Sequence, residues 1–312
     1  MFVREVAGGV EVWTPAKLNL FFEVLAKRTD GFHEIETLMV PVDIYDTLTV
    51  ENDPAGRLEL SCGWVRQDND RASDSPGALP ADADNLAIKA VDLLRRRCGE
   101  GRGARLRLAK RIPAAAGLGG ASSDAAAALV AANRVWRLGL SVAKLAELAA
   151  ELGSDVPFFL YGGPAICRGR GERIEPLAGL GVFDAAIVRP PVGLATADVY
   201  GRCRPADTPR RVTEIVDALR RGDLAATGAE MVNRLEPAAA SLSPWVERLH
   251  REFAAADCVA AQLTGSGSCY FGLCRSARHA RSVAARLRSA DVGTVFVVRS
   301  LGADGCRALD MH

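Results

Sequence analysis

A glycine-rich loop followed by two serines has the residue types best suited to bind an anion. It runs from Pro113 to Ser123 and joins a strand-like segment to an alanine-rich segment typical of a buried helix. Its glycines let backbone N–H groups turn towards a ligand, and the first-turn N–H groups of the helix would face the same point. We expect Ser122 and Ser123 to cap the helix and to donate their hydroxyls. The loop therefore predicts a phosphate site.

Two familiar phosphate motifs are excluded by the spacing of this loop. No Lys-Ser or Lys-Thr pair follows the glycines, as a Walker A loop requires, and the G-x-G-x-x-G spacing of a dinucleotide fold is absent. The remaining interpretations are a third kind of nucleotide loop or a plain glycine turn that caps a core helix. Asp124 beside the serines and the alanines that follow favour the nucleotide loop.

Lys17 and Asp155 are charged residues in apolar surroundings, where a charge is costly to bury unless it is paired. The chain has 39 basic residues, few of them lysines, and Lys17 is the lysine that stands in an apolar segment, P-A-K-L-N-L. Period-two alternation places Lys17 and Asn19 on one face of a strand, which is either the wet face of an edge strand or part of a site. Asp155 either caps a short helix that begins at Pro157 or faces a cleft and pairs with Lys17.

The composition indicates a small-molecule protein. A net charge of +1 over 312 residues gives no electrostatic footprint for nucleic acid or for an anionic membrane. Eight scattered cysteines without a C-x-x-C pair indicate buried thiols in a reducing compartment. No signal peptide is recognised, and the longest apolar run, 125–132, is too short to span a bilayer. We therefore expect a soluble cytoplasmic protein, a monomer or weak dimer.

The order of predicted elements indicates an α+β protein of two domains, residues 1–180 and 181–312. Strands are predicted at 10–13, 17–25, 47–50, 185–188 and 294–298, and a hairpin at 162–176. Helices are predicted at 85–97, 141–152, 212–221, 223–235, 244–256 and 277–289. A mobile surface loop is expected at 66–84, and T-G-S-G-S at 264–268 reads as a second glycine turn between two strands.

Four motifs together resemble the GHMP kinase superfamily of galactokinase, homoserine kinase and mevalonate kinase: P-A-K-L-N-L, G-L-G-G-A-S-S-D-A, G-S-D-V-P-F-F and T-G-S-G-S. The segments D-G-F-H-E at 30–34 and D-N-L at 84–86 are most similar to members that use ATP to phosphorylate a cytidine-diphosphate-linked methylerythritol in the non-mevalonate isoprenoid pathway. The resemblance covers nearly the whole chain. It implies a ribosomal protein S5 domain 2-like N-terminal domain, a ferredoxin-like C-terminal domain and an active site in the cleft between them.

The resemblance implies a role for each matching residue. Lys17 and Asp155 would be the catalytic pair, with Asp155 orienting or accepting the proton of a tertiary hydroxyl and Lys17 keeping it ionised. The residues that would cradle the ATP phosphates are Pro113, Ala114, Ala115, Ala116, Gly117, Leu118, Gly119, Gly120, Ala121, Ser122 and Ser123. The residues that would bind substrate are Asn19, Phe32, His33, Tyr200, Gly265, Ser266 and Gly267. Phe32 and Tyr200 would stack on cytosine while His33 hydrogen-bonds it.

Some positions depart from the family pattern. Alanines at 114–116 and 121 replace frequent glycines, which predicts a stiffer loop, and Arg234 stands where the family usually has an acid. Mg²⁺ would be carried chiefly by the nucleotide, with help from Ser123, and no all-protein metal site is evident. The rival interpretations are a kinase of the homoserine or mevalonate type, a catalytically silent relative that serves as a sensor, and an unrelated glycine-loop nucleotide binder.

Overall fold

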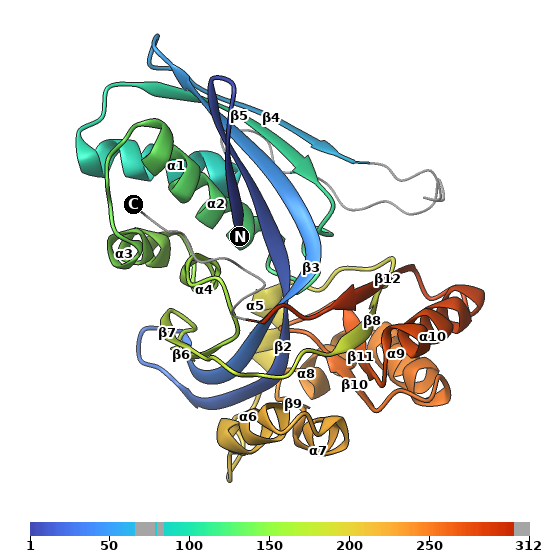
Figure 1. Cartoon of the computed structure of the whole chain (residues 1–312). Coiled ribbons are helices and arrows are strands. Elements are labelled where there is room, and N and C mark those ends of the chain that lie inside the picture. The colour runs from blue at the N-terminus through green and yellow to red at the C-terminus, as the bar shows by residue number, and fades with distance from the viewer. Residues whose placement is uncertain (66–78, 80–83, 303–312) are drawn as a thin grey trace.

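The computed structural model describes residues 1–65, 79 and 84–302. Within them the chain forms two sheets with helices packed against each (Figure 1). The predicted loop at 66–84 lies outside the described residues except for residues 79 and 84. In the described part of the chain, no helix combines the length and apolarity needed to cross a membrane.

The first sheet is built around two long antiparallel strands that run through the middle of the molecule (Figure 1). Its main path is β1-β2-β3-β5-β4, with β6 paired to β3, β7 to β6 and β9 to β2. The strands are β1 (Phe2–Val6), β2 (Gly9–Lys27), β3 (His33–Asp53), β4 (Leu58–Trp64), β5 (Gly103–Lys110), β6 (Ala165–Gly169), β7 (Arg173–Pro176) and β9 (Val232–Asn233). Strand β2 carries the P-A-K-L-N-L motif, so its register against β3 decides where Lys17 lies.

Four helices lie on one side of this sheet: α1 (Leu86–Cys98), α2 (Gly120–Val135), α3 (Val142–Leu152) and α4 (Val156–Leu160). Helix α2 contacts β2, β3 and the other three helices, so it is buried on nearly every side. Its alanines suit this position because small side chains let neighbouring backbones approach closely. The prediction of a buried alanine-rich helix is confirmed.

The second sheet has the strand order β10-β11-β8-β12 and is antiparallel throughout. Its strands are β8 (Asp184–Arg189), β10 (Ala260–Leu263), β11 (Tyr270–Cys274) and β12 (Thr294–Arg299). The helices of this half are α5 (Thr196–Arg202), α6 (Val212–Arg220), α7 (Leu224–Glu230), α8 (Glu236–Leu242), α9 (Pro244–Ala255) and α10 (Ala277–Ser289). The βαββαβ path with this strand order is that of a ferredoxin-like unit.

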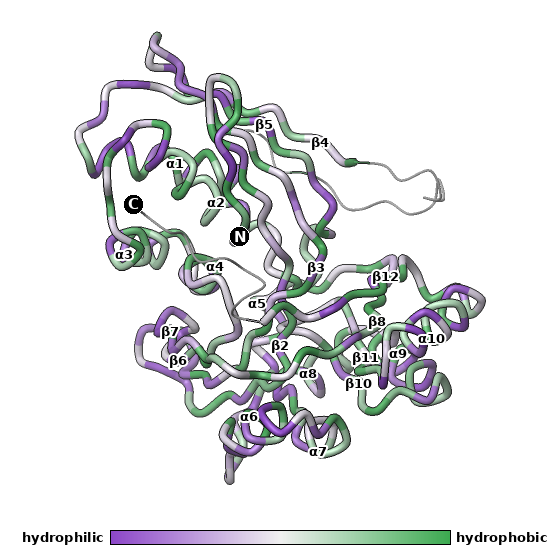
Figure 2. The backbone as a smooth tube through the Cα atoms, viewed as in Figure 1, coloured by the Kyte–Doolittle hydropathy of each residue, from purple (hydrophilic) through white to green (hydrophobic). Residues whose placement is uncertain are grey.

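The two sheets share one apolar core. Leu18 and Phe21 of β2 pack in the same buried cluster as Ile187 of β8 and Phe271 of β11. Gln262 of β10 also donates side-chain hydrogen bonds to the carbonyls of residues 19 and 20 in β2. Figure 2 shows hydrophobic and hydrophilic residues mixed along the strands of the first sheet and hydrophilic residues at the turn of the β6–β7 hairpin. The shared core holds the two halves against each other.

The predicted hairpin, the strands at 185–188 and 294–298 and all but one of the helices occur close to their expected bounds. The strands predicted at 10–13 and 17–25 are parts of the single strand β2, and 47–50 is only the last part of the much longer β3. One helix prediction is wrong: 223–235 is not continuous, since α7 ends at Glu230 and β9 follows. Helices α5 and α8 were not predicted. The expectation that the cysteines are buried holds for Cys167, Cys269 and Cys274, but Cys98 is exposed because it ends α1 beside the Gly99 cap. The boundary at 180/181 falls in the segment between β7 and β8 and stays a prediction.

Candidate active site

A cavity of about 930 Å³ brings together residues from both halves of the chain. Its walls come from β2, the turn after β2, the glycine-rich loop, the start of α4, the β6–β7 turn, α5 and the second glycine turn. The predicted residues that line it are Lys17, Phe32, His33, Ala115, Gly117, Gly119, Ser122, Asp155, Tyr200, Gly265, Ser266 and Gly267. The fold therefore gathers motifs that lie up to 250 positions apart along the chain.

Lys17 lies against the glycine-rich loop in the wall of this cavity, and its backbone N–H donates to the carbonyl of Leu118 at 3.0 Å. Its Nζ lies 3.5 Å from Oδ2 of Asp155 and donates a 2.6 Å hydrogen bond to Oδ1 of Asn19. The Asn19 amide group donates in turn to the hydroxyl of Thr37 at 2.9 Å. The Lys17 side chain is 4% exposed and that of Asp155 32% exposed, so the carboxylate is the member open to a ligand. The predicted pairing of Lys17 with Asp155 is confirmed.

Asp155 stands at the N-cap of α4 but does not cap it. Its backbone has φ −83° and ψ −13°, and its side chain makes no capping hydrogen bond. The carboxylate turns to Lys17 instead, which decides between the two interpretations of this residue. Asn19 is fully buried and does not line the cavity. It acts on Lys17, so the expectation that Asn19 touches substrate is not supported by this geometry.

The glycine-rich loop brings its backbone against the second half of the chain. Gly117 has φ +77°, and a Cβ at this position would lie 2.2 Å from the carbonyl oxygen of Thr264. A Cβ on Gly119, which has φ +73°, would lie 3.0 Å from Cγ of Lys17. Only glycine permits both the positive φ and this close approach. Ala115 holds φ +50°, a conformation that a glycine would adopt without the steric cost.

Helix α2 begins at Gly120, with Gly119 as N-cap and no side-chain capping bond. The expectation that the two serines cap the helix is therefore wrong. Ser122 faces the cavity, whereas the Ser123 hydroxyl is buried and donates to the carbonyl of Pro15 at 2.6 Å. Ser123 thus offers no hydroxyl to a metal ion, which contradicts its expected help with Mg²⁺. The uncapped first turn leaves backbone N–H groups for an anion.

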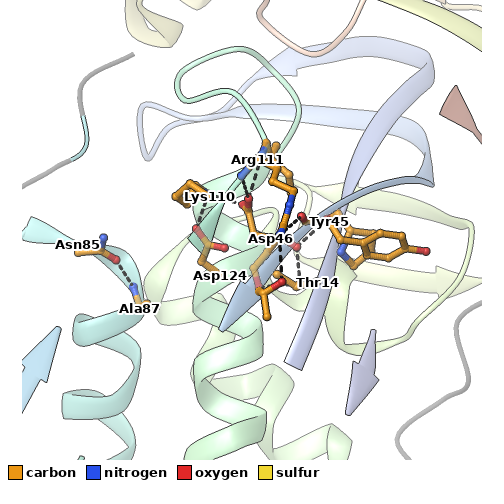
Figure 3. Close-up of polar contacts among 12 residues, drawn as sticks. Thr14, Tyr45, Asp46, Asn85, Ala87, Lys110, Arg111 and Asp124 are labelled. Carbon is orange, nitrogen blue, oxygen red and sulfur yellow. Dashed lines mark hydrogen bonds and ion pairs between the residues drawn. The ribbon is translucent and has the colours of Figure 1, made fainter. Parts of the chain in front are cut away.

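A buried cluster of Asp46, Lys110 and Asp124 lies beneath this loop (Figure 3). Lys110 Nζ contacts both carboxylates, at 2.5 Å in the case of Asp124, and Oδ1 of Asp46 accepts from the backbone N–H of Ile112 at 2.9 Å. Burial raises the pKa of Asp124 to about 8, against the opposing effect of the Lys110 charge. The cluster ties the start of the loop to the first turn of α2. Lys17 is thus not the only lysine in apolar surroundings.

The segment after β9 holds the second glycine turn in place. The side-chain amide of Asn233 donates at 2.8 Å to the carbonyls of Leu263 and Gly265. Arg234 makes a bidentate contact, at 2.7 and 3.0 Å, with the fully buried carboxylate of Glu23 in β2. An arginine at this position therefore has a structural partner. Sequence reasoning missed Glu23, whose signal was a lone acid in an apolar strand.

Three aromatic rings, those of Phe32, His33 and Tyr200, also line the cavity. The rings of His33 and Tyr200 pack with centroids 5.1 Å apart. The guanidinium of Arg170 lies over the ring of Phe32, with Cζ 4.8 Å from the ring centroid. Burial, with a smaller effect of Lys27, lowers the pKa of His33, so its imidazole is neutral near pH 7. Burial and the Asp155 charge raise the pKa of Tyr200. These rings offer flat apolar surface and a neutral donor and acceptor.

Not every predicted site residue reaches the cavity. Ala116, Leu118, Gly120 and Ser123 are buried beneath the loop, and Pro113, Ala114 and Ala121 are also outside the lining. Conversely, Lys27, Arg170 and Thr196 line the cavity without having been predicted. Arg170 lies in an R-G-R-G turn, a signal that sequence reasoning recognised as a hairpin but did not connect to the site.

Comparison with known proteins identifies the family of this chain. The model of the GHMP kinases N-terminal domain matches residues 85–163, and that of the GHMP kinases C-terminal domain matches residues 215–292. A 4-diphosphocytidyl-2-C-methyl-D-erythritol kinase of Pelotomaculum thermopropionicum is 42% identical over 278 residues, which cover 88% of this chain and 93% of the relative. The chain belongs to the GHMP kinase family. A kinase of the same name from Shouchella clausii is 41% identical, over 83% of this chain and 84% of the relative.

Solved structures of related kinases have the same fold as this GHMP kinase. A crystal structure of 4-(cytidine 5'-diphospho)-2C-methyl-D-erythritol kinase superposes with a TM-score of 0.75 at 35% identity and covers 93% of this chain and 98% of its own. Homoserine kinase from Cytophaga hutchinsonii superposes with a TM-score of 0.71 at 20% identity, covering 97% of each chain. The latter match shows the shared fold. The predicted two-domain GHMP kinase fold is confirmed.

Proposed function

We propose that this protein transfers the γ-phosphoryl group of ATP to the 2-hydroxyl of 4-diphosphocytidyl-2-C-methyl-D-erythritol, in the non-mevalonate route to isoprenoid precursors. The observation that carries the proposal is that Lys17 and Asp155 pair in one cavity that the glycine-rich loop and three aromatic rings also line. A kinase for a nucleotide-linked alcohol needs these three parts in one site. The names of the relatives at 41 and 42% identity support the same substrate.

Asp155 serves as the group that orients the hydroxyl and accepts its proton. As the hydroxyl oxygen forms its bond to phosphorus, the bond from phosphorus to the ADP oxygen breaks and the proton passes to the carboxylate. Lys17 lies close enough to balance the carboxylate and to stabilise negative charge on the transferring group. Phosphoryl transfer needs positioning and charge stabilisation more than covalent help, and this pair supplies both.

The phosphates of ATP fit the uncapped first turn of α2 and the loop at Gly117 and Gly119. A side chain at either glycine would collide with Thr264 or Lys17, so the loop presents bare backbone to a ligand. Within the described residues, no cluster of three or more His, Cys, Asp and Glu side chains forms a metal site. Mg²⁺ held by the nucleotide would supply further neutralisation of phosphate charge, with Ser122 and Asp155 among the oxygen-bearing side chains on the cavity wall.

The cytosine would bind at Phe32, His33 and Tyr200 in the same cavity. Stacking on a ring is tolerant of base identity, so hydrogen bonds from His33 must provide the selection for cytosine. A neutral imidazole can donate from one nitrogen and accept at the other, as the edge of cytosine requires. A cytoplasmic location and a monomer or weak dimer remain predictions of the sequence.

The test is ADP release by the purified protein with the cytidyl alcohol, homoserine or mevalonate as acceptor. We expect turnover with the cytidyl alcohol alone and a new phosphate ester on its tertiary carbon, detected by ³¹P NMR. Turnover with homoserine or mevalonate would retain the kinase chemistry and overturn the substrate. No turnover with any acceptor, together with ATP binding, would indicate the silent sensor.

A further inference from the structure

We propose that Arg170 determines specificity by binding the diphosphate group that links cytidine to the alcohol. This subsite rests on the proposed function and deepens it. The catalytic pair and the three aromatic rings have other roles in the proposed function, and none of them is assigned to that anionic linker. The geometry of the β6–β7 hairpin assigns it to this arginine.

The turn of the hairpin lies close to both Asp155 and Phe32. A Cβ on Gly171 would lie 3.7 Å from Oδ1 of Asp155, so the turn passes beside the carboxylate that receives the proton. The preceding residue, Arg170, places its Cζ 4.8 Å from the centroid of the Phe32 ring. A ligand with its base at Phe32 and its hydroxyl at Asp155 must run its connecting group past Arg170.

The guanidinium of Arg170 is less engaged with carboxylates than its neighbours in the hairpin. Arg168 pairs with Glu36 at 2.8 Å and with Glu175 at 2.5 Å. Arg170 approaches Glu172 only at 3.9 Å, because Oε2 of Glu172 accepts the backbone N–H of residue 170 at 2.7 Å. Glu172 therefore fixes the turn while the Arg170 side chain, 30% exposed, keeps donors for a ligand.

The charge of the cavity wall matches an anionic linker. Its charged residues are Lys17, Lys27, Arg170 and Asp155, and Lys27 and Arg170 lie beside the aromatic rings. The planar fork of an arginine pairs with phosphate oxygens through two parallel hydrogen bonds, which a lysine cannot do. Arg170 is therefore the better fixed anchor, and Lys27 adds positive potential beside it.

The experiment compares equilibrium binding of CDP, cytidine and ATP to the wild-type protein, Arg170→Gln and Arg170→Lys. For Arg170→Gln we expect the Kd of CDP to rise about 10-fold or more, as for loss of a charged hydrogen bond, with the Kd values of cytidine and ATP unchanged. The Kd of CDP for Arg170→Lys should lie between those of the wild type and Arg170→Gln, because lysine keeps the positive charge but lacks the planar guanidinium. Arg173→Gln is the matched control, because Arg173 belongs to the same hairpin, pairs with Glu34 at 3.5 Å and is outside the cavity lining.

Equal losses for CDP and cytidine in Arg170→Gln would overturn the proposal, because they would assign Arg170 to packing on Phe32 alone. An unchanged CDP affinity would overturn it as well. If the wild type turns over the cytidyl alcohol and Arg170→Gln has the same KM for it, the subsite is refuted and the proposed function is retained. A wild-type protein that binds neither CDP nor cytidine would refute both.

Discussion

The ammonium group of Lys17 lies 3.5 Å from the carboxylate of Asp155, and the side chain of Asn19 holds it there with a 2.6 Å hydrogen bond. Asn19 is itself held by Thr37, and its backbone N–H donates to the hydroxyl of Thr264 at 3.1 Å. Thr264 belongs to the second glycine turn. The proposed catalytic pair is thus positioned by contacts that cross from one half of the chain to the other.

Replacing Asp155 with asparagine removes the proton acceptor while keeping its size. We expect kcat to fall about 10²- to 10⁴-fold, the range for loss of a general base, with little change in the Kd of ATP. Steady-state kinetics and nucleotide binding measure the two effects. Asp198→Asn, an exposed carboxylate of nearby α5 outside the cavity lining, should keep full activity. Equal activity of both variants would remove Asp155 from the mechanism.

Gly117→Ala tests the close approach of the phosphate loop to the second half. Its Cβ would lie 2.2 Å from the Thr264 carbonyl at a positive φ, so the loop must move and ATP affinity should fall at least 10-fold. Gly139→Ala is the matched control, since Gly139 also has a positive φ, +66°, but a Cβ there meets nothing within 4 Å. Equal ATP affinities of the Gly117→Ala and Gly139→Ala variants would show that the contact of residue 117 with Thr264 does not determine ATP binding.

Arg234→Gln leaves the fully buried Glu23 carboxylate without its bidentate partner. We expect the free energy of unfolding to fall by about 2 kcal/mol or more, measured by urea denaturation. Arg220→Gln breaks a 3.5 Å pair with Asp217 whose side chains are 49% and 60% exposed, and it should cost less than about 1 kcal/mol. Similar losses for both variants would mean that Glu23 is satisfied without Arg234.

Asp124→Asn tests the buried cluster through pH. In the folded protein the pKa of Asp124 is raised to about 8, so between the ordinary carboxylate range and pH 8 the folded state holds a proton that the unfolded state has released. This group therefore makes the wild type lose stability as pH rises through that window, by up to about 1.4 kcal/mol per pH unit. The asparagine variant lacks this contribution, so its stability relative to wild type should increase from pH 5 to pH 8. A constant difference would show that Asp124 is ionised throughout.

The low pKa of His33 predicts a pH dependence for substrate affinity. Because burial lowers this pKa below the ordinary 6.5, the imidazole stays neutral above that pH and gains a proton only at lower pH. We expect the KM of the cytidyl alcohol to be constant from pH 7 to 8 and to rise as pH falls through the lowered pKa of His33. His33→Gln should have a higher KM that no longer varies with pH. A wild-type KM unaffected by acid would exclude His33 as an acceptor.

Local patterns were sufficient for most of the fold. Ser141 and Gly153 bound α3, and Asn85 caps α1 through its side chain, as expected of residues that satisfy the free backbone groups of helix ends. The prediction of one helix over 223–235 was wrong because contacts with distant parts of the chain decide the structure there. Residues 232–233 pair with β2, and the Asn233 side chain bonds the distant second glycine turn, so tertiary contacts outweigh helix propensity there.

The sequence by itself predicted the parts of the proposed site: a glycine-rich loop, a lysine and a carboxylate, each recognisable from residue type and spacing. It could not reveal that Asp155 turns from its helix to Lys17, that Ser123 points into the core, or that Arg170 reaches Phe32. Each of these depends on which distant backbone lies within hydrogen-bonding or van der Waals distance. Such distances follow from how the two sheets pack around their common core, and no local pattern in the chain encodes them.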